Sequence, residues 1–357
     1  MTRQLTIADV AARAGVSKAT VSRAFSRPNL LSAAVADHVR RVADEIGYVP
    51  NRIARALSTG RFGVIALLVP DIANPFFPPL IRAAQARADA AGYAVLIGDS
   101  DETPDREDVL LSKMAVQVDG FVVASPRQAE ARILHHASQR PTVLINRDIP
   151  AVTRVLMDVA GGITSALSHL VGLGHRRIAY VSGPAASWAN QQRETAVAAA
   201  AQRLGVALLA VPAHRPTYEA GRAVVDELVR TGVTAVLAFD DLVAQGVVAG
   251  YQVRDMAIPG DVSVVGFDDV LAATTHPPLT TIAGHCADAG AAAVDLLIRM
   301  IDTGETTPSL LTIPTALVVR ASTAGARPAA ALAQTSAGGA RRPGLRAATP
   351  SRSPGPP

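Results

Sequence analysis

Apolar residues along the chain follow two patterns, and the pattern changes near residue 62. Before that point, apolar residues recur at helical spacing, which predicts three short helices within residues 1–49. After it, apolar runs of strand length (FGVIALLV, YAVLIG, GFVVAS and TVLIN) alternate with helical segments at 76–91, 104–117 and 128–138. The alternation restarts after residue 158 with the runs RIAYVSG, TAVLAF and VSVVGF. Two such series predict an α/β body of two lobes, each a parallel sheet with helices on both faces.

Polar residues mark where the three predicted helices begin. Thr6, with Asp9 three residues later, is typical of a capping box at the start of the first helix. Ser17 and Ser32 are the expected caps of the second and third helices, and Gly15 belongs to a tight turn between the first two. Helices this short need a shared core. Eight apolar residues can form it: Val10, Ala11, Val16, Val21, Phe25, Val39, Val42 and Ile46.

The outer face of the second predicted helix is left free of that core. It carries Lys18, Ala19 and Arg23. A helix, a tight turn and a second helix with such a face form the helix-turn-helix arrangement, which places its second helix in the major groove of DNA. The alternative is a small helical bundle with a solvated basic face.

Charge supports the DNA-binding interpretation of this N-terminal head. Residues 1–61 contain ten Lys or Arg against four Asp or Glu, a net charge of +6, whereas the whole chain carries +4. The rest of the chain is therefore slightly acidic, at −2. A basic segment on an otherwise near-neutral protein favours nucleic acid as its partner.

Composition predicts a globular protein without a membrane segment. Of the 357 residues, 49% are hydrophobic and 18% charged, and no apolar run approaches the ~18 residues of a membrane span. The N-terminus lacks the apolar stretch and cleavage site of a secretory signal, and the single Cys286 fits a reducing cytoplasm. Residues 324–357, rich in Ala, Pro, Gly, Ser and Arg, are predicted to form a disordered tail.

Longer stretches of the chain, up to about residue 323, resemble the LacI/GalR family of bacterial transcription regulators. These stretches are TIADVAARAGVSKATVSRAF, GYVPNRIARALSTG, DIANPFF, VDGFVVASP, LINRD, HLVGLGHRRIAYVSG, TAVLAFDD and IPGDVSVVGFDD followed by PPLTTI. The resemblance implies a cytoplasmic homodimer that binds a palindromic operator in double-stranded DNA, each subunit reading one half-site. No cofactor or metal is expected.

The resemblance also divides the chain into parts. It implies a helix-turn-helix DNA-binding domain at 1–49, a hinge helix at 50–61, a body at 62–323 that binds an effector and dimerises, and the tail at 324–357. The body resembles periplasmic binding proteins. Its expected N-lobe comprises about 62–157 and 284–313, and its expected C-lobe about 158–281 and 314–323.

Candidate DNA-binding residues follow from the same resemblance. They are Thr6, Ser17, Lys18, Ala19, Thr20, Ser22 and Arg23 in the head, and Asn51, Arg52, Ala54, Arg55 and Leu57 in the hinge. Leu57 would wedge into the minor groove and bend the DNA, with Arg52 and Arg55 beside it as phosphate contacts. The alternative for Leu57 is a linker leucine buried on the body.

Candidate effector-binding residues are expected at the carboxyl ends of strands, where open α/β sheets bind ligands. Asn74 and Phe76 follow the first strand of the body, and the family resemblance adds Asn146, Arg147, Arg193, Asp241 and Asp268. Phe76 could stack on a sugar ring or a base, or be a core aromatic. Arg and Asp offer paired donors and acceptors to neighbouring hydroxyls, or form ordinary salt bridges. Departures from the family pattern at Ala196, Asp240 and Gly284 weaken the analogy with the usual sugar pocket.

We therefore predict a repressor whose operator binding is controlled allosterically by a small metabolite, a sugar or sugar derivative bound between the lobes. A purine- or nucleoside-responsive regulator, or an activator, of the same family is the alternative.

Two other functions are disfavoured by the sequence. An enzyme is unsupported, because GLGHRR at 172–177 lacks the third glycine of a dinucleotide fingerprint and precedes a strand instead of following one. No nucleophile elbow or HExxH sequence is present, and the adjacent His135 and His136 cannot share a helical face. An exported binding protein is opposed by the basic head. The predicted tail contains only two large apolar residues, Leu332 and Leu345. This pattern cannot form a coiled coil, so we expect a homodimer and not a tetramer.

Overall fold

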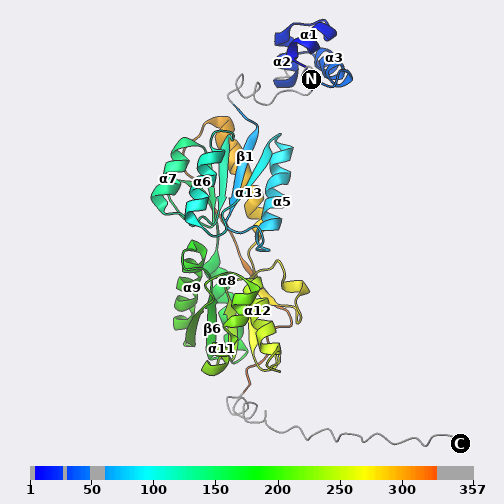
Figure 1. Ribbon diagram of the computed structural model, residues 1–357. Coiled ribbons are helices and arrows are strands. Elements are labelled where there is room, and N and C mark those ends of the chain that lie inside the picture. Colours follow the sequence, from blue (N-terminus) through cyan, green and yellow to red (C-terminus); the bar gives the residue numbers. More distant parts are fainter. Residues whose placement is uncertain (1–4, 27–29, 49–60, 328–357) are drawn as a thin grey trace, which may run out of the picture. The chain divides into compact units, whose positions relative to one another are not determined.

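The structure, a computed structural model, describes residues 5–26, 30–48 and 61–327 (Figure 1). Contacts divide the chain into one unit of residues 1–159, 185–192 and 284–315 and another of 160–184, 193–283 and 316–357. We call the described part of the first unit from residue 61 onward the N-lobe, and that of the second unit the C-lobe. Residues 185–192 were predicted to be part of the C-lobe but group with the first unit. No helix among the described residues is long and apolar enough to span a membrane.

The head consists of three helices, as predicted. They are α1 (Ile7–Ala14), α2 (Lys18–Ser26) and α3 (Ala33–Glu45). All eight predicted core residues belong to one apolar cluster, in which Val10, Val21 and Val39 are fully buried. Gly15 ends α1 with φ 67°, a left-handed conformation that glycine adopts without strain. The small core is what holds these short helices together, since none is long enough to be stable alone.

The N-lobe contains one sheet of six parallel strands in the order β11-β5-β4-β3-β1-β2. Its strands are β1 (Val64–Val69), β2 (Ala94–Asp99), β3 (Gly120–Ala124), β4 (Thr142–Ile145), β5 (Thr153–Met157) and β11 (Leu310–Ile313). Its helices are α5 (Phe77–Ala90), α6 (Pro104–Met114), α7 (Glu130–Gln139) and α13 (Cys286–Thr303). Helices α6 and α7 cover one face and α5 and α13 the other, so the central strands are buried on both sides (Figure 1).

The C-lobe repeats this plan in a second sheet of order β12-β10-β9-β8-β6-β7. Its strands are β6 (Arg177–Ser182), β7 (Ala207–Pro212), β8 (Ala235–Ala238), β9 (Ser263–Asp268), β10 (Thr280–Ala283) and β12 (Ala316–Val318). Its helices are α8 (Val159–Gly172), α9 (Trp188–Leu204), α10 (Tyr218–Ala223), α11 (Val225–Thr231), α12 (Asp241–Gln252) and the short 3-10 helix η2 (Ala272–Thr274). All strand pairs are parallel except β10 with β12. The α/β class with two lobes of essentially parallel sheets is confirmed.

The last described residues correct the predicted start of the tail at residue 324. The backbone of Ala324 exchanges hydrogen bonds with Ser263 (N–H to Oγ, 3.1 Å; Oγ–H to O, 3.2 Å) and accepts one from the His175 ring (3.0 Å). Ala326 donates its N–H to Leu173 O (2.8 Å), and Arg327 pairs with Asp261. Residues 324–327 therefore belong to the C-lobe, because buried polar side chains bind their backbone. Residues 328–357, and the predicted hinge helix except Arg61, lie outside the described residues.

Candidate DNA-binding and effector sites

The outer face of α2 is available for DNA. Val21 and Ala24 on its inner side are fully buried, whereas Lys18, Ala19 and Arg23 are exposed. Thr20 and Ser22 are half-buried, and Ser17, before the helix, is exposed. Ser17 Oγ caps α2 by accepting the Thr20 N–H (3.0 Å). The core on one side of α2 therefore presents the predicted recognition residues together on the other.

Thr6 has a structural role in addition to its predicted DNA contact. Its N–H and its hydroxyl both donate to the Asp9 carboxylate (2.8 and 2.7 Å) at the start of α1. The side chain is exposed, so a DNA contact stays a prediction. The predicted hinge contacts Asn51, Arg52, Ala54, Arg55 and Leu57 lie outside the described residues.

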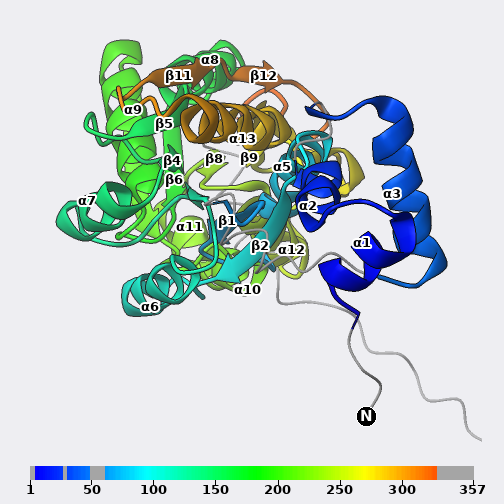
Figure 2. The ribbon, with the colours of Figure 1, turned by 90° about the horizontal axis from the view of Figure 1, so that it is seen from above.

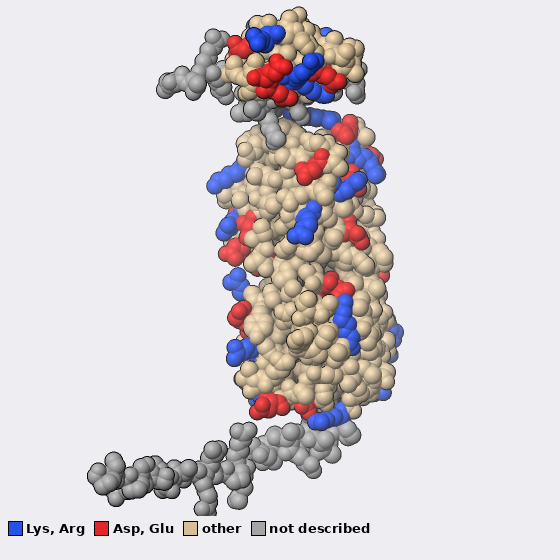
Figure 3. All heavy atoms as spheres, turned by 90° about the vertical axis from the view of Figure 1, so that its right-hand side faces the viewer, with Lys and Arg blue, Asp and Glu red and all other residues tan. Residues whose placement is uncertain are grey.

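Charge on the described part of the head differs between its helices. Five basic residues (Arg13, Lys18, Arg23, Arg40 and Arg41) stand against four acidic ones (Asp9, Asp37, Asp44 and Glu45). Helix α2 carries Lys18 and Arg23 and no acidic residue, whereas α3 carries three of the four acids. On the face drawn in Figure 3, charges of both signs meet on the head, and those of the body are scattered over a largely uncharged surface. The positive field is thus concentrated on α2 itself.

In the N-lobe, the predicted effector residues follow β1 and β4, which flank β3 in the sheet. Asn74 is buried, and its Oδ1 accepts the Phe76 N–H (2.9 Å), which shapes the turn into α5. The Phe76 ring is 7% exposed and packs edge-on against Phe77 at 5.0 Å. Asn146 adopts a left-handed conformation, φ 54°, and Arg147 Nε is buried with no hydrogen-bond partner among the described residues. These four residues therefore share one edge of the sheet.

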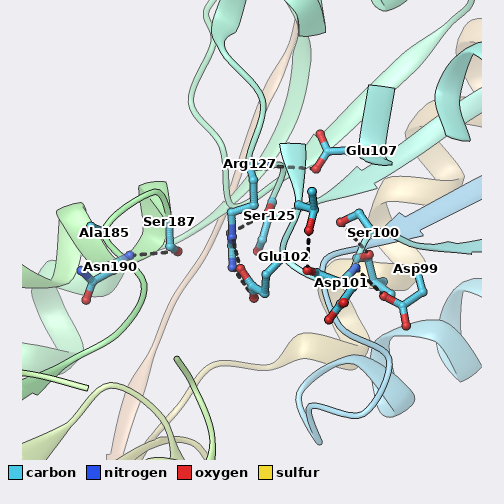
Figure 4. A network of polar contacts seen from close by, with 12 residues as sticks. Asp99, Ser100, Asp101, Glu102, Glu107, Ser125, Arg127, Ala185, Ser187 and Asn190 are labelled. Atoms are coloured by element: carbon cyan, nitrogen blue, oxygen red, sulfur yellow. Dashed lines mark hydrogen bonds and ion pairs between the residues drawn. The ribbon is translucent and has the colours of Figure 1, made fainter. Parts of the chain in front are cut away.

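A polar network lies just after β3, the strand between β1 and β4 (Figure 4). It was not predicted from the sequence. Arg127, just after β3, donates from Nε and Nη2 to the two carboxylate oxygens of Glu102 (2.5 and 2.9 Å) and from Nη1 to Ser125 O (2.7 Å). Glu107 Oε2 accepts the Arg127 N–H (3.0 Å), and burial raises the pKa of this carboxyl. Arg127 is 9% exposed. The Arg127 guanidinium is thus fixed at the carboxyl edge of the N-lobe sheet. Because β3 and β4 are neighbours, the same edge carries Asn146 and Arg147.

In the C-lobe, Arg193 is held between two aromatic rings. The guanidinium carbon lies 3.6 Å from the ring centre of Phe267 and 4.5 Å from that of Phe239. Arg193 Nη1 donates to Phe239 O, and Nη2 donates to Asp268 Oδ1 (3.3 Å). These side chains come from α9 and from the ends of the adjacent strands β8 and β9. A planar cation fixed in this way can donate to a ligand without first losing rotational freedom.

The carboxylate of Asp268 is the acceptor of the same cluster. Burial raises the pKa of this carboxyl to about 8; Arg193 opposes the rise, and the charges of Asp240 and Asp241 add to it. The backbone of Asp268 has φ 102°, which is unusual for a residue other than glycine. A buried acid at a strand end next to a buried cation is typical of a binding site and not of a surface salt bridge.

Asp241 has a different environment from the one expected of a ligand contact. Its Oδ1 accepts the Thr281 hydroxyl (2.6 Å), and its Oδ2 accepts the N–H groups of Val270 (2.9 Å) and Leu271 (3.4 Å). Burial raises its pKa to about 6. Both oxygens thus hold the chain after β9, and direct contact with an effector stays a prediction. The neighbouring Asp240 caps α12 through Oδ1, which accepts the Val243 N–H (2.7 Å).

The structure brings the predicted Arg193 and Asp268 together with Phe239 and Phe267, which the sequence analysis did not name; it did not name Arg127 either. Both FDD sequences place a Phe directly before two Asp residues, and this repeated pattern could have pointed to Phe239 and Phe267. No group of three or more His, Cys, Asp or Glu side chains in the described residues is arranged to hold a metal ion.

Comparisons with known proteins identify the two kinds of domain and the relatives of the chain. Residues 6–51 match the family described as bacterial regulatory proteins, lacI family, and residues 167–323 match the periplasmic binding protein-like domain. The HTH-type transcriptional regulator DegA of Bacillus subtilis is 33% identical over 89% of this chain and 98% of its own length. The ribose operon repressor of Halalkalibacterium halodurans is 32% identical over 90% and 97%. A solved complex of the transcriptional regulator CelR with cellobiose is 29% identical over 89% and 99%, with a TM-score of 0.68.

Proposed function

Since the chain belongs to the lacI family of bacterial regulatory proteins, we propose that it is a repressor that reads a palindromic operator as a homodimer and responds to a sugar. It is a DNA-binding transcriptional regulator, as its relatives are. None of the relatives named above is an enzyme, and we infer that this chain is not an enzyme either. We also infer that it acts in the cytoplasm, where its DNA target lies.

The observation that supports operator reading is the composition of the α2 outer face. Lys18 and Arg23 can donate to guanine edges and to phosphates, and Ala19 leaves room for close approach to the groove floor. The hinge residues Asn51, Arg52, Ala54, Arg55 and Leu57 would add minor-groove and phosphate contacts. Two copies of one head on a two-fold axis require two half-sites, so the operator is expected to be palindromic.

The observation that supports a sugar as effector is the Arg193–Asp268 cluster. A fixed guanidinium from α9 and a carboxyl at the end of β9 suit neighbouring hydroxyls, because one donates and the other accepts. Phe239 and Phe267 are themselves buried, and their rings hold the guanidinium in place for a ligand. We include Asn74, Phe76, Asn146 and Arg147 of the N-lobe among the effector residues. Among the relatives, the CelR complex contains cellobiose.

Operator reading can be tested with DNA that the wild-type protein selects from a random pool. Arg23→Ala should lower affinity for this DNA by ~1 to 3 kcal/mol and relax base preference at one or two positions of each half-site. Arg40→Ala is the matched control, because Arg40 is an exposed arginine on α3, outside the helix-turn-helix pair. Equal weakening by both variants on every sequence would mean that Arg23 contacts only phosphates.

Effector binding can be tested by calorimetry with a panel of mono- and disaccharides and nucleosides. Arg193→Ala should abolish binding of whichever compound the wild-type protein binds, without changing operator affinity in its absence. Arg203→Ala is the control on the same helix, because Arg203 is exposed and donates to Thr164 Oγ1 (3.0 Å). A compound bound equally well by the Arg193 variant would place the effector elsewhere, and a nucleoside instead of a sugar would change the effector class.

A further inference from the structure

Arg61 joins the start of the N-lobe to the end of helix α13. Its Nη1 donates to Asp302 Oδ1 (2.6 Å) and its Nη2 to Ile301 O (2.8 Å). The side-chain hydrogen bond to Asp302 is the main reason that the pKa of Arg61 is raised. One guanidinium thus binds both a carboxylate and a carbonyl group in the last turn of α13, where a cation is also favoured by the helix dipole.

The two residues after Arg61 are fixed by a second carboxylate. Asp119, directly before β3, accepts the N–H of Phe62 at Oδ1 (2.8 Å) and the N–H of Gly63 at Oδ2 (2.7 Å). The guanidinium of Arg140 lies 6.0 Å from the centre of the Phe62 ring. Three consecutive residues are therefore held before β1 begins. Arg61 is the last residue of the predicted hinge at 50–61, so this end of the hinge is anchored.

Helix α13 is closely packed within the N-lobe. It lies along α5 in both views (Figures 1 and 2) and also contacts β3, β4 and β5. A Cβ added at Gly290 would lie 2.3 Å from Leu80 O of α5, so the two backbones touch. The helix has 18 residues, which corresponds to about 27 Å. Its first turn follows β10 of the C-lobe through only Gly284 and His285, and its last turn holds Arg61.

We propose that Arg61, Asp119 and Asp302 form a clamp that fixes the base of the hinge to α13, so that operator affinity depends on the position of this helix. The clamp orders the chain before DNA is bound, which lowers the entropy lost when the hinge binds its operator. A displacement of α13 starting at the connection from β10 reaches the hinge through Arg61. This inference rests on the proposed function, since it describes how the same protein is regulated.

Asp302→Asn tests the clamp without altering a basic residue that could contact DNA. It should weaken binding to the selected operator roughly 5- to 30-fold, through lost order at the hinge base. Electrostatics alone predicts the opposite sign, because removing a negative charge favours DNA binding. Asp295→Asn is the matched control: Asp295 lies on the same helix and pairs with Arg87 (2.9 and 2.5 Å), with similar exposure. It should leave affinity unchanged or slightly raise it.

A double-mutant cycle then assigns the effect to the pair. In an Arg61→Ala background, Asp302→Asn should have no further effect on operator affinity, because its partner is gone. The melting temperature should barely change in either single variant, since the pair is about half exposed. Equal operator affinity of the Asp302→Asn, Asp295→Asn and wild-type proteins would overturn the clamp while leaving the proposed function intact. A wild-type protein that selected no DNA sequence would overturn both.

Discussion

Replacing Asp268 by Asn is expected to stabilise the free protein. Burial raises the pKa of this carboxyl from its ordinary 3.8 to about 8, even with Arg193 opposing the rise. The carboxyl thus holds its proton more tightly in the folded than in the unfolded chain. Folding stability therefore falls as the pH rises from 3.8 to about 8. Asn carries no charge, accepts the same hydrogen bond from Arg193 Nη2, and tolerates the positive φ of this position.

The expected gain is large for a single substitution. One pKa unit corresponds to about 1.4 kcal/mol. At pH 7 only the interval from 3.8 to 7 counts, because the folded-state pKa of about 8 lies above it; this costs the wild-type fold roughly 4 kcal/mol. Rearrangement of the surroundings lowers this cost, and we expect Asp268→Asn to raise the free energy of unfolding by about 2 to 4 kcal/mol. Affinity for the effector should fall, because the amide keeps only one of the two carboxyl oxygens as an acceptor. A residue kept at the expense of stability is typical of a binding site.

Urea unfolding at pH 5, 6.5 and 8 measures this effect. The difference between variant and wild type should grow with pH across this range, while groups common to both cancel. Asp226→Asn is the control, since Asp226 lies in the same lobe, is 76% exposed and pairs with Arg254; its effect should stay within about 0.5 kcal/mol at every pH. An Asp268→Asn protein less stable than wild type at pH 8, or a difference independent of pH, would refute the argument from burial.

Two further predictions concern buried polar groups of the C-lobe. Asp241→Ala should lower the free energy of unfolding by about 3 kcal/mol, because the Thr281 hydroxyl and the Val270 N–H lose their acceptor; unchanged urea unfolding would show that water replaces the carboxylate. Burial lowers the pKa of His175, so the folded state keeps this ring neutral and stability should fall as the pH drops below about 6.5. His175→Gln should reduce the loss of melting temperature between pH 7 and 5, and an equal loss in both proteins would contradict this role.

The sequence predicted the fold best where strands are buried on both faces. The run VIALLV of β1 and the strand GFVVA are almost wholly buried, so each appears as an uninterrupted apolar segment. Strands β11 and β12 have only four and three residues, and neither is mostly buried. Such short edge strands carry no pattern that separates them from loops. Strands β5, β7 and β10 were missed as well. Strand β10 is buried throughout, but its sequence TTIA contains two threonines and is not an apolar run.

The FDD sequence after β8 shows why the effector residues were harder to predict. The sequence places Asp240 and Asp241 side by side after β8. The direction in which each side chain points, however, depends on the backbone conformation. Asp240 has extended φ and ψ before α12 and caps the helix, whereas Asp241, one residue later, turns toward Thr281 and the chain after β9. Thr281 lies 40 residues farther along the sequence. The partner that occupies Asp241 is therefore set by strand order, which a single sequence does not contain.

The same reasoning applies to the cation in the cluster. Arg193 is held by rings from β8 and β9, which are neighbours in the sheet but lie 28 residues apart, at Phe239 and Phe267. The Phe239 ring fits only because position 183 is glycine: a Cβ there would lie 2.6 Å from the ring. Gly183 directly follows β6, the strand on the other side of β8. The ends of β8 and β9 thus each contribute a ring, and the end of β6 contributes the glycine that leaves space for one of them. These residues lie far apart in the sequence, and only strand order brings them together around the guanidinium.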